Sequence, residues 1–188
     1  MGNRPIKLFR LIAVLLLALM FVFAQAAFSW PRRLFGAQVD LLPALMVFTS
    51  LRLGIGPIIT LAFVGGLCMD ALSLNPLGVS PLPLCIVGML IHLKREQILK
   101  DEVVAQVLLG MGASAAGALG TLTLILSVGE SPLLGMGFLW DLVVMTVGGG
   151  VAAPLIFQFM SLLENALTYQ AHSQPSFRPD REIRRGRN

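Results

Sequence analysis

Long apolar stretches alternate with short polar or Gly/Pro-rich interruptions, and this pattern runs from Leu11 to Leu163. A helix needs about 20 apolar residues to cross a bilayer core about 30 Å thick. Strict alternation of apolar and polar residues, as in barrel strands, is missing from these stretches. The pattern therefore predicts an all-α integral membrane protein with six transmembrane helices, over about 8–28, 39–53, 55–74, 77–93, 103–127 and 135–163.

Two of these six segments are short for a full span. The second ends at the turn around Gly54, and the fourth carries Pro81 and Pro83, so both segments are candidates for re-entrant or buried helices. The first segment contains Ala24-Gln25-Ala26, which matches the cleavage pattern of a signal peptide. Its apolar stretch continues to Phe28, however, which favours an uncleaved span.

The termini differ from this apolar body. Residues 1–168 are predicted to form a single six-helix domain, and residues 169–188, poor in apolar residues and rich in arginine, a disordered basic tail. Hydrophobic residues make up 56% of the chain and charged residues 13%, against roughly 25% charged residues in soluble domains. The mean hydropathy of +0.81 agrees, and a soluble globule is excluded.

The basic residues predict the orientation. With a cytoplasmic N-terminus, only Arg32 and Arg33 of the 14 Lys and Arg residues fall on the outer side. The other twelve are cytoplasmic: Arg4, Lys7, Arg10, Arg52, Lys94, Arg95, Lys100, Arg178, Arg181, Arg184, Arg185 and Arg187. Because cytoplasmic loops are enriched in Lys and Arg, both termini are predicted to be cytoplasmic.

Three carboxylates lie within or beside the apolar segments, near the predicted outer ends of their helices: Asp40, Asp70 and Asp141. A charge at the centre of a membrane helix costs roughly 2.5–3.5 kcal/mol on insertion scales. Together with Gln25 they form either an outward-facing polar cluster that pairs with Arg32 and Arg33 or receives a partner, or separate structural groups. In the second case Asp40 caps a helix and Asp141 complements the dipole of a first turn. Asp70 lies near a helix C-terminus, where the dipole opposes it, so a function or a specific partner is expected.

Small residues form the other signal. Gly112, Ala116 and Gly120 recur at four-residue spacing, the pattern that lets membrane helices approach closely, within the protein or against another protein's helix. Catalytic motifs and phosphate-binding loops are missing from the sequence, and Cys68 and Cys85 lack the spacing of a metal site. A non-enzymatic protein without cofactors is expected.

The region from Asp40 to Leu90 resembles the bacterial rod-shape-determining MreD family. The resemblance rests on Asp40-Leu41-Leu42, on Leu51-Arg52 with Gly54 and Gly56-Pro57, on Gly65-Gly66-Leu67 followed by Asp70, and on Pro76-Leu77-Gly78. Asn75 departs from the Gly or Ser that members often have before this turn. Asp40, Asp70, Asn75, Pro76, Leu77, Gly78 and Asp141 are therefore candidates for partner binding or for a structural role.

The resemblance implies a non-enzymatic scaffold of the cell-elongation machinery in the bacterial inner membrane. Such proteins bind MreC, a single-pass membrane protein, and associate with MreB, RodA and a class B penicillin-binding transpeptidase during peptidoglycan synthesis; no nucleic acid is involved. The family is similar in fold to the substrate-binding (S) components of energy-coupling-factor transporters. A substrate-binding subunit of a vitamin-type transporter is therefore the alternative.

Overall fold

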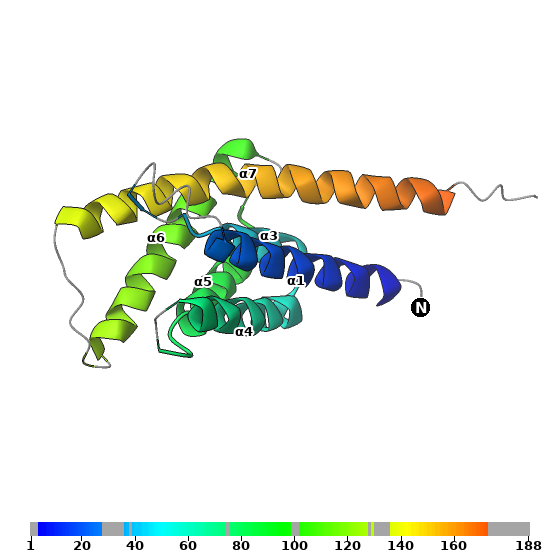
Figure 1. Cartoon of the computed structure of the whole chain (residues 1–188). Coiled ribbons are helices and arrows are strands. Elements are labelled where there is room, and N and C mark those ends of the chain that lie inside the picture. The colour runs from blue at the N-terminus through cyan, green and yellow to red at the C-terminus, as the bar shows by residue number, and fades with distance from the viewer. Residues whose placement is uncertain are drawn as a thin grey trace, which may run out of the picture. The chain divides into compact units, whose positions relative to one another are not determined.

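The computed structural model describes residues 4–27, 36–37, 39–73, 76–98, 102–127, 129 and 136–172. Regular secondary structure in these residues is entirely helical, as predicted. Figure 1 labels the helices α1 (Arg4–Ala27), α3 (Leu42–Arg52), α4 (Ile55–Leu72), α5 (Pro81–Lys94), α6 (Val103–Ser127) and α7 (Met136–His172). The chain forms two compact units, residues 1–157 and residues 158–188, and the second contains the C-terminal part of α7.

Four helical stretches are long and apolar enough to cross a membrane: Leu8–Ala27, Ile55–Leu72, Val103–Ser127 and Gly137–Leu163. They coincide within about two residues with four predicted spans, which confirms an all-α membrane protein. The other two helices are shorter: α3 has 11 residues and α5 has 14. At about 1.5 Å per residue they rise roughly 16 and 21 Å, less than the roughly 30 Å of a bilayer core.

The helix α7 continues past its apolar stretch to His172, into the segment predicted to be a disordered tail from residue 169. The prediction is wrong for residues 169–172, because neither Gly nor Pro interrupts the sequence between Pro154 and Pro175. Residues 173–188 lie outside the described residues.

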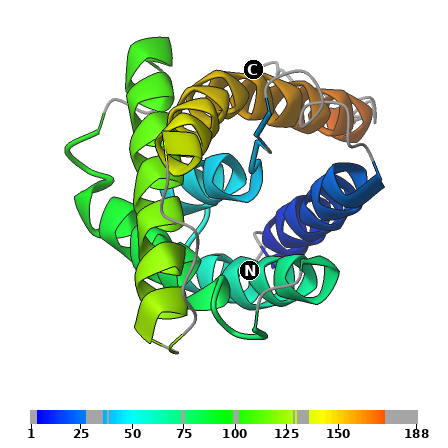
Figure 2. The ribbon, with the colours of Figure 1, turned by 60° about the vertical axis from the view of Figure 1, so that its left-hand side comes forward.

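The core of the first unit is built around α3. Every residue from Leu42 to Leu51 is buried, and α3 packs against α1, α4, α5 and α6. Figure 2 shows α3, in cyan, enclosed by these helices and the first part of α7. The rings of Phe48 on α3 and Phe157 on α7 meet edge to face, with centroids 5.1 Å apart. The second segment is therefore the central helix of the core, one of the two possibilities that its length left open.

The polar side chains of α3 are satisfied within the helix. The hydroxyl of Thr49 donates to the carbonyl oxygen of Leu45 at 2.9 Å, and that of Ser50 donates to the carbonyl oxygen of Met46 at 2.7 Å. Such bonds to the preceding turn allow Ser and Thr in an apolar helix without an unpaired group. The whole circumference of α3 can therefore be buried.

The outer helices expose apolar stripes. On α1 the exposed side chains include Ile12, Leu16, Met20 and Phe23. On α7 they include Leu139, Val143, Val147, Val151 and Leu155, in a row at four-residue intervals that winds slowly around the helix. A soluble protein rarely leaves such continuous apolar faces uncovered, whereas lipid chains cover them at no cost.

The crossing of α6 and α7 uses Gly110 and Ser114, which lie on a row of small residues adjoining the predicted row of Gly112, Ala116 and Gly120. A Cβ on Gly110 of α6 would collide with the carbonyl oxygen of Gly149 and lie 2.7 Å from the Cβ of Ala153, both on α7. A Cβ on Gly149 would in turn collide with the hydroxyl of Ser114. Gly110 and Ser114 therefore form the face at which α6 and α7 cross.

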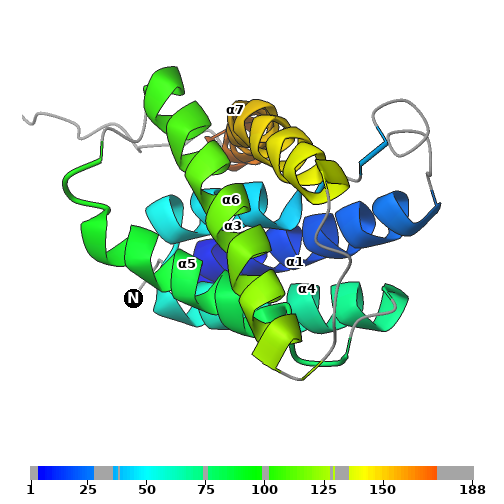
Figure 3. The same cartoon turned by 90° about the vertical axis from the view of Figure 1, so that its left-hand side faces the viewer.

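Among the predicted residues Gly112, Ala116 and Gly120, only Gly120 packs tightly. A Cβ added to Gly120 would lie 2.8 Å from the Cβ of Pro83 on α5. Gly112 and Ala116 are exposed, and a Cβ on Gly112 would meet no atom of the described chain within 4 Å. The helical twist is the reason, since two residues correspond to about 200° around a helix and place Gly112 opposite Gly110. Figure 3 shows α6 crossing in front of α3 and α5, two of the helices that it contacts.

Candidate functional site

Asp70 lies in the last turn of α4 and is only 1% exposed. Its Oδ2 accepts a hydrogen bond from the backbone N–H of Gly78 at 2.8 Å. The N–H of Ser80 is shared between the two carboxylate oxygens, at 3.2 Å to Oδ2 and 3.3 Å to Oδ1. Since Ser80 is the N-cap residue of α5, the carboxylate faces the positive end of that helix dipole. Asp70 therefore has a specific partner, which is the start of the following helix.

The turn between α4 and α5 is fixed by this carboxylate. Gly78 has φ +99°, a backbone conformation that side chains with a Cβ rarely adopt. Leu77, next to it, is 71% exposed. The prediction that the fourth helix begins near residue 77 is wrong, because residues 77–80 form the braced turn and α5 begins at Pro81. Asn75 lies outside the described residues.

Close backbone contact also holds α4 against α5. A Cβ on Gly66 would lie 2.8 Å from the backbone nitrogen and Cα of Pro81. Near the middle of α5, a Cβ on Gly88 would lie 2.9 Å from Cγ2 of Ile58 on α4. The pair α4 and α5 is therefore held both by small residues and by the Asp70 carboxylate.

Asp40 precedes α3 and fixes its first turn. Its Oδ1 accepts a hydrogen bond from the backbone N–H of Leu42 at 3.0 Å, so Asp40 pairs a free N–H of the first turn as predicted, although the N-cap residue of α3 is Leu41. The side chain of Gln25, on α1, lies beside the Asp40 carboxylate. Neither the amide oxygen nor the amide nitrogen of Gln25 makes a hydrogen bond of acceptable geometry within the described part of the chain. Asp40 and Gln25 are therefore brought together, as the polar-cluster interpretation predicts.

Asp141 is placed differently. The helix α7 begins at Met136 and has no acidic residue in its first turn, so Asp141 lies in the second turn. The interpretation of Asp141 as a first-turn dipole partner is therefore wrong, because the effect fades beyond the first turn. Asp141 is half-buried and does not line the pocket described next.

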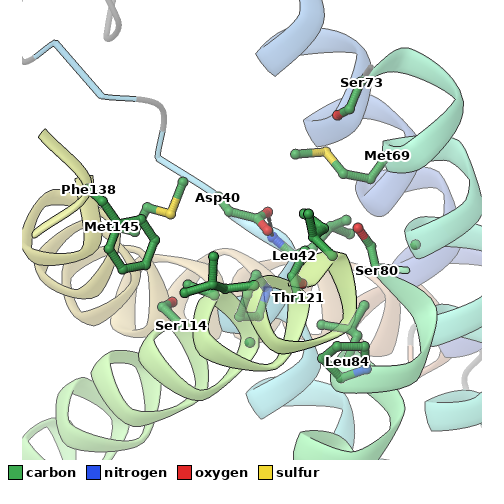
Figure 4. Close-up of a pocket in the computed structure, with 17 residues that line it drawn as sticks. Asp40, Leu42, Met69, Ser73, Ser80, Leu84, Ser114, Thr121, Phe138 and Met145 are labelled. Atoms are coloured by element: carbon green, nitrogen blue, oxygen red, sulfur yellow. Dashed lines mark hydrogen bonds between the residues drawn. The ribbon is translucent and has the colours of Figure 1, made fainter. Parts of the chain in front are cut away.

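A pocket of about 430 Å³ opens between the end of α4, the starts of α3, α5 and α7, and the C-terminal half of α6. Figure 4 shows several of the side chains around it, with Asp40 and Leu42 at the start of α3. Its polar side chains are Asp40, Ser73, Ser80, Ser114 and Thr121, and most of the remaining lining is apolar. The pocket thus collects polar groups from four separate elements.

Sequence reasoning missed this set of hydroxyls. Ser114 and Thr121 are seven residues apart on α6, with Gly117 and Ala118 between them, so all four lie on one helix face. A stripe of small and polar residues within an apolar helix was the available signal. The contributions of Ser73 and Ser80 depend on how α4 and α5 pack, which no local pattern indicates.

His92, Cys68 and Cys85 do not come together in a functional site within the described structure. Nδ1 of His92 lies 3.0 Å from the carbonyl oxygen of Ser50, which joins α5 to the end of α3. Cys68 and Cys85 are both unbridged. Among the described residues, no three His, Cys, Asp or Glu side chains are close enough together to hold a metal ion.

The arrangement thus contains a carboxylate that fixes a turn and, beside it, a pocket with one acidic group. Both lie at the same end of the helices, the end where α4 stops and α5 starts. No family model matches the chain, and neither a curated protein nor a solved structure is significantly similar to it.

Proposed function

We propose that this protein is a non-enzymatic scaffold of the MreD type in the bacterial inner membrane. In this proposal the two short helices complete six passes, both termini face the cytoplasm, and the fold resembles that of S components. The protein holds an MreC-like single-pass partner and so helps to organise RodA, a class B transpeptidase and MreB during cell elongation.

The observation that carries this proposal is the turn braced by Asp70. Two of the motifs on which the resemblance rests, Asp70 and Pro76-Leu77-Gly78, are joined by the hydrogen bond from the N–H of Gly78 to the Asp70 carboxylate. This unit holds a 71% exposed leucine on a rigid turn. A preorganised apolar side chain loses little conformational entropy on binding, which suits a docking point. The distribution of Lys and Arg along the chain supports an outer-face position for this turn in the proposal.

Copurification tests the proposal. The protein is expressed with an MreC-like protein from a rod-shaped bacterium, extracted in mild detergent, and its bound proteins are identified. Recovery of the single-pass partner supports the scaffold function. Recovery of transporter ATPase subunits instead would support the transporter alternative and overturn the scaffold.

Two equally exposed leucines provide a matched pair of variants. Leu77 and Leu93 are each 71% exposed but lie at opposite ends of the α5 region. Leu77→Ser is expected to weaken recovery of the partner, while Leu93→Ser leaves it unchanged. Because neither side chain is buried, both variants are expected to insert and fold like the parent. Equal recovery with both variants would show that the turn does not contact the partner.

A further inference from the structure

The pocket between α3, α4, α5, α6 and α7 has an unbalanced charge. Asp40 is its one ionisable side chain among the described lining residues, which include neither Lys, Arg nor His. A phosphate or carboxylate inside this pocket would therefore meet no opposite charge among the described lining side chains and would lie near Asp40. The charge pattern favours a cationic ligand.

A polar group in the pocket wall also lacks a partner within the described structure. Ser114 lines the pocket and is only 3% exposed, yet its hydroxyl makes no hydrogen bond to any described residue. Because buried polar groups are normally paired, an unpaired buried hydroxyl in the wall of a cavity indicates a bound molecule.

The rest of the lining suits an apolar body. Met69, Leu122, Phe138 and Met145 contribute from three helices, and the volume of about 430 Å³ lies within the usual range for small-ligand sites of roughly 300–1,000 Å³. Unbranched methionine side chains adapt to ligands of varied shape. A molecule with one polar end and one apolar end fits this division.

We propose that this pocket binds a small amphipathic cation, a primary ammonium group on an apolar chain. The ammonium group donates hydrogen bonds to the Asp40 carboxylate and to neighbouring hydroxyl oxygens, and the chain lies against the apolar wall. This binding is independent of the scaffold function, because it needs no protein partner. The ammonium is supplied either by a free amine or by an ethanolamine lipid headgroup whose phosphate stays outside the pocket.

Photolabelling of the purified full-length protein in phosphatidylcholine nanodiscs tests this proposal. The probe is an alkylamine carrying a diazirine, and the matched control probe is the carboxylic acid of the same chain length. Saturable labelling near Met69 and Met145 by the amine, blocked by octylamine and not reproduced by the acid, is expected. Blocking by phosphatidylethanolamine added to the nanodiscs would identify a lipid headgroup as the source of the ammonium.

Matched variants separate charge from fold. Asp40→Asn keeps an oxygen for the N–H of Leu42 but removes the charge, and it is expected to weaken amine binding about ten-fold or more. Asp141→Asn removes the same charge outside the pocket and is expected to change nothing. Ala118→Phe, which fills the pocket and keeps Asp40, is expected to abolish saturable labelling. Labelling that does not saturate, that the acid probe equals, or that Asp40→Asn leaves unchanged would overturn the proposal.

Discussion

Replacing Asp70 by leucine tests the brace between α4 and α5 directly. The substitution removes the acceptor for the N–H groups of Gly78 and Ser80, both of which are half-buried. An unpaired buried N–H costs about 1–3 kcal/mol, and the favourable interaction with the dipole of α5 adds about 0.3–1 kcal/mol. Because water or lipid headgroups reach half-buried groups, a total of about 2–4 kcal/mol is expected. Asp70→Asn keeps one acceptor oxygen and is expected to cost about half as much.

Amide hydrogen exchange, measured by mass spectrometry in detergent, reports on this brace locally. Exchange in the peptide that contains Gly78 and Ser80 is expected to be fastest in Asp70→Leu, intermediate in Asp70→Asn and slowest in the parent. Asp141→Asn serves as the control, since it changes a carboxylate elsewhere. The thermal unfolding temperatures of the three Asp70 forms are expected to follow the reverse order. Unchanged exchange of this peptide in Asp70→Leu would refute the argument, because the hydrogen bonds would then not hold the turn.

Three further outcomes are expected. Gly110→Leu destabilises the protein severely because its side chain would collide with Gly149, whereas Gly112→Leu, facing open space, changes the unfolding temperature in detergent little. Gly78→Ala costs about 1–2 kcal/mol through its positive φ and increases proteolysis at the turn; unchanged stability would contradict the turn geometry. His92→Ala removes one hydrogen bond and costs about 0.5–1.5 kcal/mol in a denaturation experiment, and a larger loss would indicate a further role.

Long apolar runs predicted the architecture because each span follows from its own sequence. The four long predicted spans agree within about two residues with the apolar helical stretches that could cross a membrane. At a short connection between two helices, the residue at which the second helix begins depends on groups that are distant in the sequence. The helix α5 begins at Pro81, and not near residue 77, because the carboxylate of Asp70, ten residues before Ser80, binds the amides of the turn. Because nearly every residue has a backbone N–H, the sequence does not show which amides a carboxylate binds. The sequence therefore indicates a function or a specific partner for Asp70 but does not identify the partner.

In the candidate site, too, the local features were predictable from the sequence, whereas the features that depend on helix packing were not. Asp40 was identified as a helix cap and as a neighbour of Gln25 from local sequence and topology. The choice of Gly112 and Ala116 was wrong because four-residue spacing does not reveal which of two opposite faces of α6 is buried. The pocket joins residues from five helices, so its shape became evident only with the packing.

The burial of α3 has a consequence for biogenesis. With only 11 residues and no face turned to lipid, α3 is too short to partition into the bilayer as an independent stop-transfer segment. Its neighbours α1 and α4 carry the hydrophobic length for insertion. The central helix therefore acquires its place only as later segments leave the translocon and enclose it. In a ribosome-bound nascent chain that is just long enough for α3, but not α4, to leave the exit tunnel, α3 should accordingly still be exposed to water-soluble labelling reagents.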